Sequence, residues 1–370
     1  MRICHMTSAH ERFDVRIFHR QCTSLALKGY ETYLVATGES CEKNDVHVLG
    51  IGKKSNSRFA RMIGTSRKVY KKSLELNADL YEIHDPELLP YGIKLLKKGH
   101  KVIWDSHEDY FKLMDTKTYI PKPIRKLIVP LFSAYYKRAL KKFSAVLVAS
   151  PHIKESIEEY NKNVHVITNY PTIDDEEILN RWPDYKSKKV CFAGGIAQQW
   201  SHKETIDALH ECKGVNYVLC GSGSTEYLND LKKKPGWKQV DYRGRIPFSD
   251  VINVMMECSV GLVLWNPQNN RGGKMGTLGN TKMFEYMRAG LPIICTDFIL
   301  WRQIVEKYNC GICVSRGDKD GLIKAIKTLT DNPGLAEQMG ENARRAVLSE
   351  YNWKTQEKKL YKVYEQLLAE

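Results

Sequence analysis

Residues 279–297, GNTKMFEYMRAGLPIICTD, place a base and an acid at the start of an apolar helix. Asn280 and Thr281 are residue types that cap helix N-termini, where unpaired backbone N–H groups bind anions. Lys282 and Glu285 follow, three residues apart and on one face of the helix. The lysine can meet a phosphate, and the carboxylate can accept two hydrogen bonds from a sugar diol. We interpret the segment as a diphosphate site with a ribose beside it. In the alternative, Glu285 only complements the positive end of its own helix and Lys282 is solvated.

Glycines mark the ends of two expected strands in the second half of the chain. FAGG places Gly194 and Gly195 after one strand, and CGSGS places Gly221 after another. Glycine at such a turn lets the backbone approach a nucleotide closely. Neither stretch is a Walker A loop or a G-x-G-x-x-G motif, and a tight turn would explain either one alone. The long glycine-rich loop 266–279 before the helix favours a binding site, because compact connections are seldom so long.

Polar clusters follow three expected strands in the first half of the chain. They are the segment 10–16 (HERFDVR), which holds Asp14 and Arg16, the pair His84 and Asp85, and the pair His107 and Glu108. Because the carboxyl ends of parallel strands meet at one edge of a sheet, we expect these clusters to point into the same cleft. A single histidine at a strand end is often only a hydrogen-bonded structural group, so none of them is catalytic by its position alone.

The elements that must position these residues alternate between strand and helix patterns along all 370 residues. The pattern runs from RICHMTS to NVHVIT and restarts at KVCFAGG, after the acidic, proline-containing segment NYPTIDDEE. Strands joined by crossover helices form parallel sheets covered on both faces, and a chain of this length exceeds the usual size of one core. We therefore predict an α/β protein with two Rossmann-like, doubly wound domains that face each other across a cleft. The predicted domains are residues 1–169 and 170–352, and a last helix, 353–370, packs back on the first.

The positive charge of the chain is concentrated in its first half. The net charge is +14, of which residues 1–170, with 29 Lys and Arg against 18 Asp and Glu, supply +11. Residues 120–143, IPKPIRKLIVPLFSAYYKRALKKF, carry seven basic residues and no acid around a helical apolar stripe. We expect the stripe to pack on a sheet and the lysines to form its wet face. The one-sided charge still favours an anionic membrane surface or a phosphate-rich ligand. Nucleic acid is not expected, because stacking aromatics and recognised motifs are missing.

The remaining composition indicates a reduced cytoplasmic protein without a metal centre. Most of the ten cysteines lie in apolar runs, as core thiols do in a reducing compartment. Cys310 and Cys313 form a single C-x-x-C with no flanking histidine, so zinc is not expected. The N-terminus lacks the apolar stretch of a signal peptide, and no apolar run is long enough to span a membrane. We expect a cytoplasmic protein, peripheral on the inner face of the membrane.

The order of these motifs resembles the family 4 glycosyltransferases, retaining enzymes of the GT-B fold that build bacterial cell-surface polysaccharides. The resemblance spans nearly the whole chain. It is carried by H-x3-D-x-R-I-F at 10–18, HDPELLP at 84–90, D-x-H-E at 105–108, TKMFEYMRAGLPIICTDF at 281–298, CGICV at 310–314 and MGENARRAVLSEYNW at 339–353. It implies a nucleotide diphosphate sugar held mainly by the second domain, with no cofactor and no metal.

The resemblance also implies roles for single residues. Glu285 would bind the ribose hydroxyls, the helix start at Asn280 and Thr281 would receive the diphosphate, and His107 would contact the transferred sugar. The leaving diphosphate would deprotonate the acceptor while positive charge stabilises it.

Two positions depart from the family pattern. The first acid of the usual Glu-x7-Glu is Thr277 here, so its contact with the sugar is lost or comes from the backbone of the loop around Gly279. The usual Arg and Lys after the first glycine turn are displaced; Lys203 is the expected replacement, with Lys282 as a second cation and Arg245 as a further candidate.

We therefore expect a glycosyltransferase that moves a sugar from a UDP-sugar, or next a GDP-sugar, to a growing lipid-linked glycan. Two alternatives share the architecture. A nucleotide-sugar 2-epimerase would interconvert free nucleotide sugars without an acceptor. An inactive sugar-nucleotide-binding subunit would bind a donor without turning it over.

Overall fold

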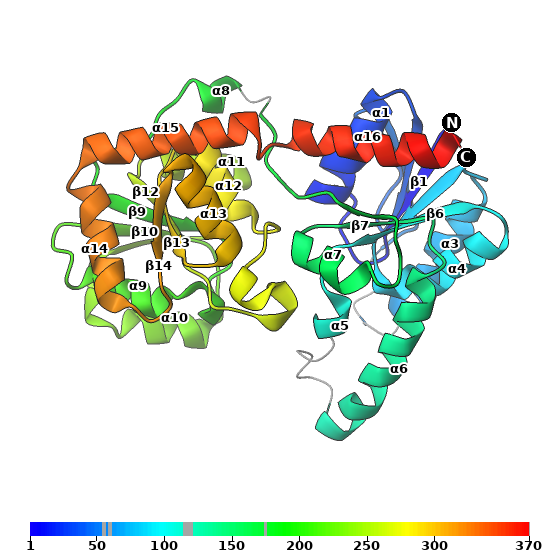
Figure 1. Cartoon of the computed structure of the whole chain (residues 1–370), viewed down its shortest axis with the longest axis horizontal. Coiled ribbons are helices and arrows are strands. Elements are labelled where there is room, and N and C mark those ends of the chain that lie inside the picture. Colours follow the sequence, from blue (N-terminus) through cyan, green and yellow to red (C-terminus); the bar gives the residue numbers. More distant parts are fainter. Residues whose placement is uncertain (54–56, 58–60, 114–120, 174–175, 370) are drawn as a thin grey trace. The chain divides into compact units, whose positions relative to one another are not determined.

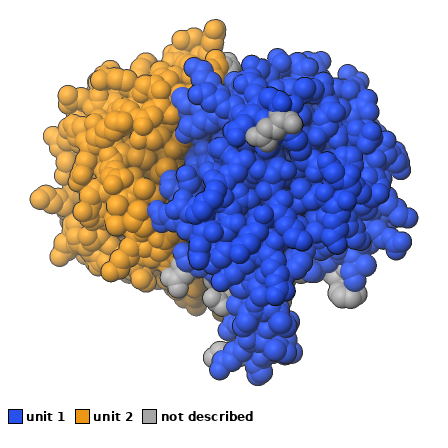
Figure 2. Space-filling view, turned by 45° about the vertical axis from the view of Figure 1, so that its right-hand side comes forward, with its two compact units in different colours: residues 1–169, 269–271, 355–370 blue, residues 170–268, 272–354 orange. Residues whose placement is uncertain are grey.

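Two separate sheets organise the chain. The computed structural model describes residues 1–370 except 54–56, 58–60, 114–120, 174–175 and 370. Unit 1 comprises Met1–Asn169, Asn269–Arg271 and Thr355–Glu370, and unit 2 comprises Tyr170–Gln268 and Gly272–Lys354 (Figure 2). Each unit has a predominantly parallel sheet flanked by helices, which confirms the predicted α/β class.

The sheet of unit 1 has the strand order β3-β4-β2-β1-β5-β6-β7-β8. All neighbouring strands are parallel except the antiparallel pair β3 and β4 at one edge. Its strands are β1 (Arg2–Met6), β2 (Glu31–Ala36), β3 (Cys41–Lys43), β4 (Val46–Gly50), β5 (Leu80–Ile83), β6 (Lys101–Ser106), β7 (Ala145–Val148) and β8 (Val164–Val166). The central strands are buried along almost their whole length, as expected for a parallel sheet with both faces covered.

The helices of unit 1 include the last one of the chain. They are the π-helix η1 (Val15–Cys22) with α1 (Thr23–Leu27), η2 (Arg61–Thr65) with α3 (Ser66–Leu74), η3 (Pro86–Leu88) with α4 (Leu89–Lys97), α5 (Tyr110–Leu113), α6 (Lys122–Leu140), α7 (Pro151–Ile157) and α16 (Trp353–Ala369). Helix α16 lies along unit 1 (Figure 1), where Tyr361 donates to the carbonyl of Ser24 at 2.8 Å. The fully buried Tyr364 reaches the strands from the same helix.

The predicted packing of the basic stripe on the sheet is wrong for most of α6. Ile124, Leu127, Leu131 and Tyr135 are exposed, with Leu127 at 67%. Only the C-terminal part of the helix, from the partly buried Phe132, packs against the core, and the rest extends away from the sheet of unit 1 (Figure 1). The pattern of apolar residues predicted the helix correctly, but periodicity does not say what covers an apolar face.

The sheet of unit 2 is entirely parallel, in the order β11-β10-β9-β12-β13-β14. From β9 the chain first moves outward to β10 and β11, then returns to β12 on the other side. The reversal creates a crevice at the carboxyl ends of the strands, where such sheets bind ligands. The strands are β9 (Lys189–Ala193), β10 (Asn216–Cys220), β11 (Val240–Gly244), β12 (Val260–Val263), β13 (Ile293–Thr296) and β14 (Gly311–Val314).

The helices of unit 2 cover both faces of this sheet. They are α8 (Glu176–Leu179), η5 (Gln198–Trp200), α9 (His202–Leu209), α10 (Thr225–Lys232), η6 (Pro235–Gln239), α11 (Phe248–Met256), η8 (Gly273–Met275), α12 (Thr281–Ala289), α13 (Ile299–Tyr308), α14 (Lys319–Thr330) and α15 (Pro333–Ser349). The short turn η7 (Asn269–Arg271), from the same long loop, belongs to unit 1. None of the helices among the described residues is both long and apolar enough to cross a bilayer.

Candidate active site

A cavity of about 730 Å³ opens in unit 2 at the carboxyl ends of β9, β10 and β11. The first turns of α12 form one wall. Its lining includes most of the residues predicted for nucleotide binding: Gly194, Gly195, Gly221, Arg245, Thr281, Lys282 and Glu285. The sequence therefore located a real pocket, assembled from three strand ends and a helix N-terminus.

Gly194 and Lys282 pack directly against each other. A Cβ atom at Gly194 would lie only 2.3 Å from Cε of Lys282, and φ of this glycine is +149°. A Cβ at Gly221, where φ is +136°, would lie 1.7 Å from the carbonyl oxygen of Gly194. A side chain at Gly221 would overlap the backbone, and one at Gly194 would have to displace the end of the Lys282 side chain at an unfavourable φ. The two glycines therefore allow the backbone of the turn at Gly194 and the ammonium of Lys282 to lie close together in the cavity wall.

The N-terminus of α12 is capped as the sequence predicted. The side-chain oxygen of Asn280 accepts a hydrogen bond from the backbone N–H of Lys282 at 3.1 Å. The ammonium of Lys282 lies 4.7 Å from the ring centre of Trp200 and 5.6 Å from that of Phe192, which hold the cation by its attraction to aromatic faces. Trp200 stacks in turn on Trp265, with ring centres 5.0 Å apart. The lysine is thereby directed to one end of the cavity.

Glu285 forms an ion pair with Arg288, one helical turn further along. The two side chains are 18% and 12% exposed, and Nη2 of Arg288 lies 2.8 Å from Oε2 of Glu285. Arg288 also donates from Nη1 to the carbonyl of Thr172 at 3.3 Å. A partly buried carboxylate held in this way has a fixed orientation towards a ligand in the cavity.

Four site residues predicted in unit 2 do not line this cavity: Lys203, Thr277, Gly279 and the capping residue Asn280. The ammonium of Lys203 is 3.5 Å from Asp230 and lies over the ring of Tyr227 at 5.6 Å. Thr277 is buried, where its hydroxyl accepts from the N–H of Gly279 at 3.0 Å and its carbonyl accepts from the indole of Trp301 at 2.9 Å. Thr277 and Gly279 therefore shape the loop that leads into α12.

In unit 1, Asp105 at the end of β6 is the centre of a buried polar cluster. Arg16 binds it with two hydrogen bonds, from Nε to Oδ2 at 2.8 Å and from Nη2 to Oδ1 at 2.6 Å. Gln21 donates to Oδ2 at 3.1 Å. Burial acts to raise the pKa of Asp105, but the positive charge of Arg16 and the contact with His107 hold it well below its ordinary value. Asp105 is thus an anion at neutral pH.

Asp14 and Arg16, predicted as substrate contacts, have structural partners. The carboxylate of Asp14 caps η1, where Oδ1 accepts from the N–H groups of Arg16 at 2.8 Å and Ile17 at 3.0 Å. Arg16 is 3% exposed and also donates to the carbonyl of Ile167 at 2.6 Å. The arginine therefore joins η1, β6 and the segment after β8.

His107 remains accessible at the edge of this cluster. Its Nε2 lies 3.1 Å from Oδ2 of Asp105, and its side chain is 17% exposed. The ring of His10 is 4.8 Å away, centre to centre. Next to it, Glu108 is 3.4 Å from Arg271 of η7, in the same unit. The arrangement can bind a polar ligand group at His107 while the buried carboxylate fixes the ring.

Comparison with known proteins identifies the family. A family model described as "Glycosyltransferase Family 4" matches residues 15–175, and one described as "Glycosyl transferase-like" matches residues 198–361. An uncharacterized glycosyltransferase of Methanocaldococcus jannaschii is 24% identical over 300 residues, which cover 74% of this chain and 70% of that protein. The chain belongs to the family 4 glycosyltransferases.

Solved structures show that this glycosyltransferase has the predicted GT-B fold. Sucrose-phosphate synthase from Thermosynechococcus elongatus superposes with a TM-score of 0.77 at 14% identity, over 100% of this chain and 99% of that one. The Anabaena protein HepE, in complex with UDP and glucose, gives 0.70 at 14% identity over 99% and 100%. At these identities the likeness concerns the fold.

Sequence reasoning missed several residues of the polar cluster in unit 1 and of the cavity in unit 2. Asp105 was part of a motif but had no assigned role, although an acid at the end of a buried strand needs a partner. Arg288 lies three residues after Glu285, a spacing that predicts an ion pair on a helix. His10 belonged to a polar cluster whose partner, Asp85, is 75 residues further along the chain. Only the folded sheet brings these two together.

Proposed function

We propose that this glycosyltransferase transfers a sugar, with retention of configuration, from a UDP-sugar to a lipid-linked cell-surface glycan. The observation that supports it best is the cavity of unit 2, where a helix N-terminus, Lys282 and the Glu285 carboxylate meet two glycine turns. This combination suits a diphosphate next to a ribose. Two similar structures are complexes with UDP and glucose (Anabaena HepE) and with UDP-2-fluoro glucose (a protein from E. coli), which favours uridine over guanosine.

In this proposal, positive charge on the protein stabilises the departing diphosphate. Lys282 and Arg245 line the cavity, and the N-terminus of α12 adds its partial positive charge. Fixed charges in a shielded site are effective because they need no reorganisation as the bond breaks. We propose that they replace a metal ion in this role, and that the leaving diphosphate accepts the proton of the acceptor hydroxyl.

The acceptor side of the proposal concerns the exposed face of α6. Leu127 and Leu131 are 67% and 64% exposed, and Ile124 is 50% exposed. Arg125, Lys126, Lys137 and Arg138 lie on the same helix, whose sequence has no acidic residue. A helix with apolar and basic surfaces binds anionic bilayers, in which its apolar side chains are buried among the lipids. We propose that α6 holds the enzyme on the inner face of the cell membrane, where a lipid-linked acceptor would be found.

A thermal-shift screen with UDP, GDP and ADP tests the donor assignment. A ligand that binds only the folded state raises the melting temperature, by an amount that corresponds to about 2.7 kcal/mol when its concentration is a hundred times Kd. We expect UDP to give the largest shift. A larger shift with GDP would overturn the choice of base. The lack of any shift, together with no release of nucleotide from sugar donors, would contradict the transferase proposal.

A further inference from the structure

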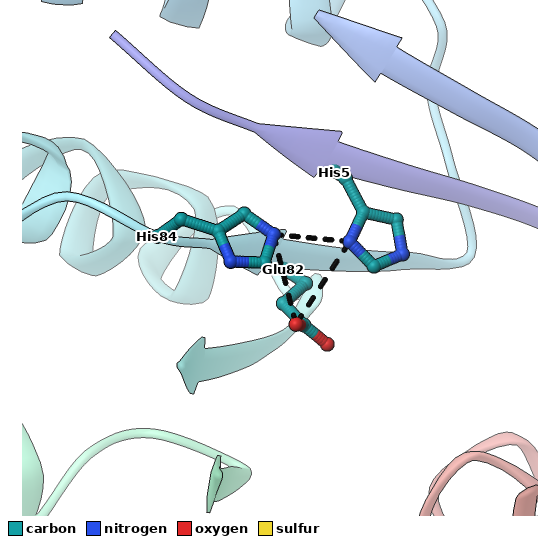
Figure 3. Close-up of side chains that lie close together, drawn as sticks. All are labelled: His5, Glu82 and His84. Carbon is teal, nitrogen blue, oxygen red and sulfur yellow. Dashed lines mark hydrogen bonds and ion pairs between the residues drawn. The ribbon is translucent and has the colours of Figure 1, made fainter. Parts of the chain in front are cut away.

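Three buried side chains of unit 1 each turn one polar atom toward the other two (Figure 3). The atoms are Nδ1 of His5, Oε1 of Glu82 and Nε2 of His84, and all three side chains are fully buried. Nδ1 of His5 lies 3.1 Å from Nε2 of His84, and Oε1 of Glu82 lies 3.8 Å and 3.6 Å from these two nitrogens. Two imidazole nitrogens and a carboxylate oxygen at such separations form a potential set of metal ligands.

The sheet of unit 1 brings these side chains together. Strands β1 and β5 are parallel neighbours, and His5 is paired in register with Glu82. His84 comes two residues after Glu82, so both side chains lie on the same face of the extended chain. The two histidines are 79 residues apart. The expectation of no metal centre came from the cysteine pattern, and no short spacing in the sequence could have predicted this group of ligands.

The three separations match the dimensions of a zinc site. In a triangle with sides of 3.1, 3.6 and 3.8 Å, the point equidistant from the corners lies about 2.0 Å from each of them. Zinc lies about 2.0–2.1 Å from histidine nitrogen and about 2.0–2.2 Å from carboxylate oxygen. A zinc ion near this point would therefore reach all three atoms after small rotations of the two rings. Zinc held by three protein side chains completes its tetrahedral shell with a water molecule.

The outer atoms of the same side chains have the partners that metal ligands need. Nδ1 of His84 lies 3.2 Å from Oδ2 of Asp105, an anion that can only accept, so a neutral His84 carries its proton on Nδ1 and a lone pair on Nε2. The hydroxyl of Tyr364 on α16 donates to Oε2 of Glu82 and lies 3.4 Å from Nε2 of His5. Because its single proton is used in this way, the hydroxyl accepts from Nε2–H of His5, which leaves the lone pair on Nδ1. Outer hydrogen bonds of this kind orient the ligands of metal sites.

A direct hydrogen bond between the two histidines is the alternative. Their rings are nearly parallel, with 12° between the planes and centres 5.3 Å apart, so one proton between Nδ1 of His5 and Nε2 of His84 could join them. That bond leaves Oε1 of Glu82 buried and without a hydrogen-bond partner among the described residues. Buried polar atoms nearly always have a partner, because an unsatisfied one is costly. A shared cation gives a partner to all three atoms, which the hydrogen bond does not.

We propose that His5, Glu82 and His84 bind a zinc ion in the core of unit 1. The ion holds β1 against β5, and through the hydroxyl of Tyr364 it also fixes α16. All three ligands are fully buried, and none of them lines the cavity that we assign to the donor. The zinc therefore stabilises the fold and takes no part in sugar transfer. The site does not depend on the proposed donor or acceptor.

Metal analysis of the purified full chain tests the site. The protein is incubated with zinc, dialysed, and measured for bound metal by mass spectrometry. We expect one zinc per chain in the wild type and at least about tenfold less in Glu82→Gln, which keeps the size of the side chain but removes the charge that binds the ion. His47→Gln is the matched control for surface histidines and should keep the wild-type content, since His47 is 39% exposed and lies 3.5 Å from Glu42. A wild type that retains no zinc, or a Glu82→Gln variant that retains as much, would overturn the proposal.

X-ray absorption of the zinc-loaded wild type keeps the test decisive if Glu82→Gln fails to fold. We expect a first shell of nitrogen and oxygen at about 2.0–2.1 Å, with outer-ring signals from two histidines and no sulfur. A shell that contains sulfur, or only one histidine, would place the zinc at other side chains and overturn the assignment. This measurement needs neither a variant nor enzymatic turnover.

The role of the outer partners gives a graded prediction. Tyr364→Phe removes the hydroxyl that contacts His5 and Glu82, and it should weaken zinc binding about 10–100-fold, as the loss of such partners does in other metal sites. Tyr361→Phe is the matched control on the same helix, because its hydroxyl donates to the carbonyl of Ser24 and contacts no proposed ligand. Competition with a zinc-binding dye measures both affinities. Equal zinc affinities in the two variants would overturn the assignment of Tyr364 as the partner that orients His5 and Glu82.

Discussion

The two units build their strand-end sites in opposite ways. In unit 1, side chains contact one another in a buried polar cluster, in which the carboxylate of Asp105 accepts hydrogen bonds from Arg16, Gln21, His84 and His107. In unit 2, the site is an open cavity made of glycine turns and a helix N-terminus. The first arrangement fixes the positions of the side chains before a ligand arrives. The second provides hydrogen-bond donors and charged groups to which a ligand in the cavity can bind. Mutations should therefore affect mainly stability in unit 1 and mainly binding in unit 2.

The largest effect is expected from Asp105→Asn in unit 1. The change leaves the buried Arg16 guanidinium without its counter-charge, and breaking a buried ion pair costs about 3–5 kcal/mol of unfolding free energy. Asp297→Asn, which breaks a pair with the half-exposed Arg302, should cost less than about 1 kcal/mol. Denaturant unfolding measures both. Equal losses of unfolding free energy in the two variants would show that the buried cluster of unit 1 contributes no more than an ordinary surface ion pair.

The same pair predicts how stability depends on pH. The folded-state pKa of Asp105 lies well below its ordinary value of 3.8, because Arg16 and His107 outweigh the effect of burial. A group of this kind stabilises the fold above the pKa that it has in the unfolded chain, and this stabilisation is lost as the pH falls through the folded-state pKa. The unfolding free energy of the wild type should therefore exceed that of Asp105→Asn by the whole difference at neutral pH. In strong acid this difference should become small.

Gly194→Ala should have the next largest effect, on binding in unit 2. An added methyl group lies 2.3 Å from Cε of Lys282 and requires an unfavourable φ, so the ammonium must move. Loss of a charge-assisted hydrogen bond to phosphate costs about 2–3 kcal/mol, which weakens UDP binding more than tenfold. Gly334→Ala is the control, because nothing lies within 4 Å of its added Cβ and it does not line the cavity. Calorimetric titration with UDP compares them, and equal affinities in the two variants would argue against Lys282 as the phosphate contact.

Local sequence rules predicted unit 2 well, because its site depends on short-range features. Each glycine turn is a short local motif, and the Asn280 cap, Lys282 and Glu285 lie in one short segment; the structure gathers the glycines, Lys282 and Glu285 at one cavity. Unit 1 was less predictable, since Asp105 and Asp85 meet partners 89 and 75 residues away. The role of Arg16 followed from its distant contact with Asp105, whereas Asp14 caps η1 locally. The strand order brings such distant partners together, and the local periodicity of the sequence does not predict the strand order.

The variant Glu285→Ala tests which part of the ligand the carboxylate in the unit 2 cavity binds. If Glu285 accepts hydrogen bonds from the ribose, wild-type protein should bind UDP more tightly than its 2′-deoxy form by about 1.5 kcal/mol, or roughly tenfold. The variant should bind the two nucleotides equally. Fluorescence or calorimetric titration gives both affinities. A preference for UDP that survives the substitution would place the ribose contact elsewhere in the cavity.

The smallest effect on the folded protein is expected at α6, the part of unit 1 whose apolar side chains are exposed. Leu127→Glu with Leu131→Glu replaces two side chains that are about two-thirds exposed, so unfolding free energy should change by no more than about 0.5 kcal/mol for each. Binding to vesicles that contain anionic lipid should weaken about tenfold or more, because two apolar side chains no longer enter the bilayer and two negative charges approach it. Leu27→Glu is the matched control, since Leu27 is 72% exposed on α1. Sedimentation with vesicles separates the cases. If Leu27→Glu weakens binding as much as the α6 variant does, attraction depends on the net charge of unit 1 and not on the apolar face of α6.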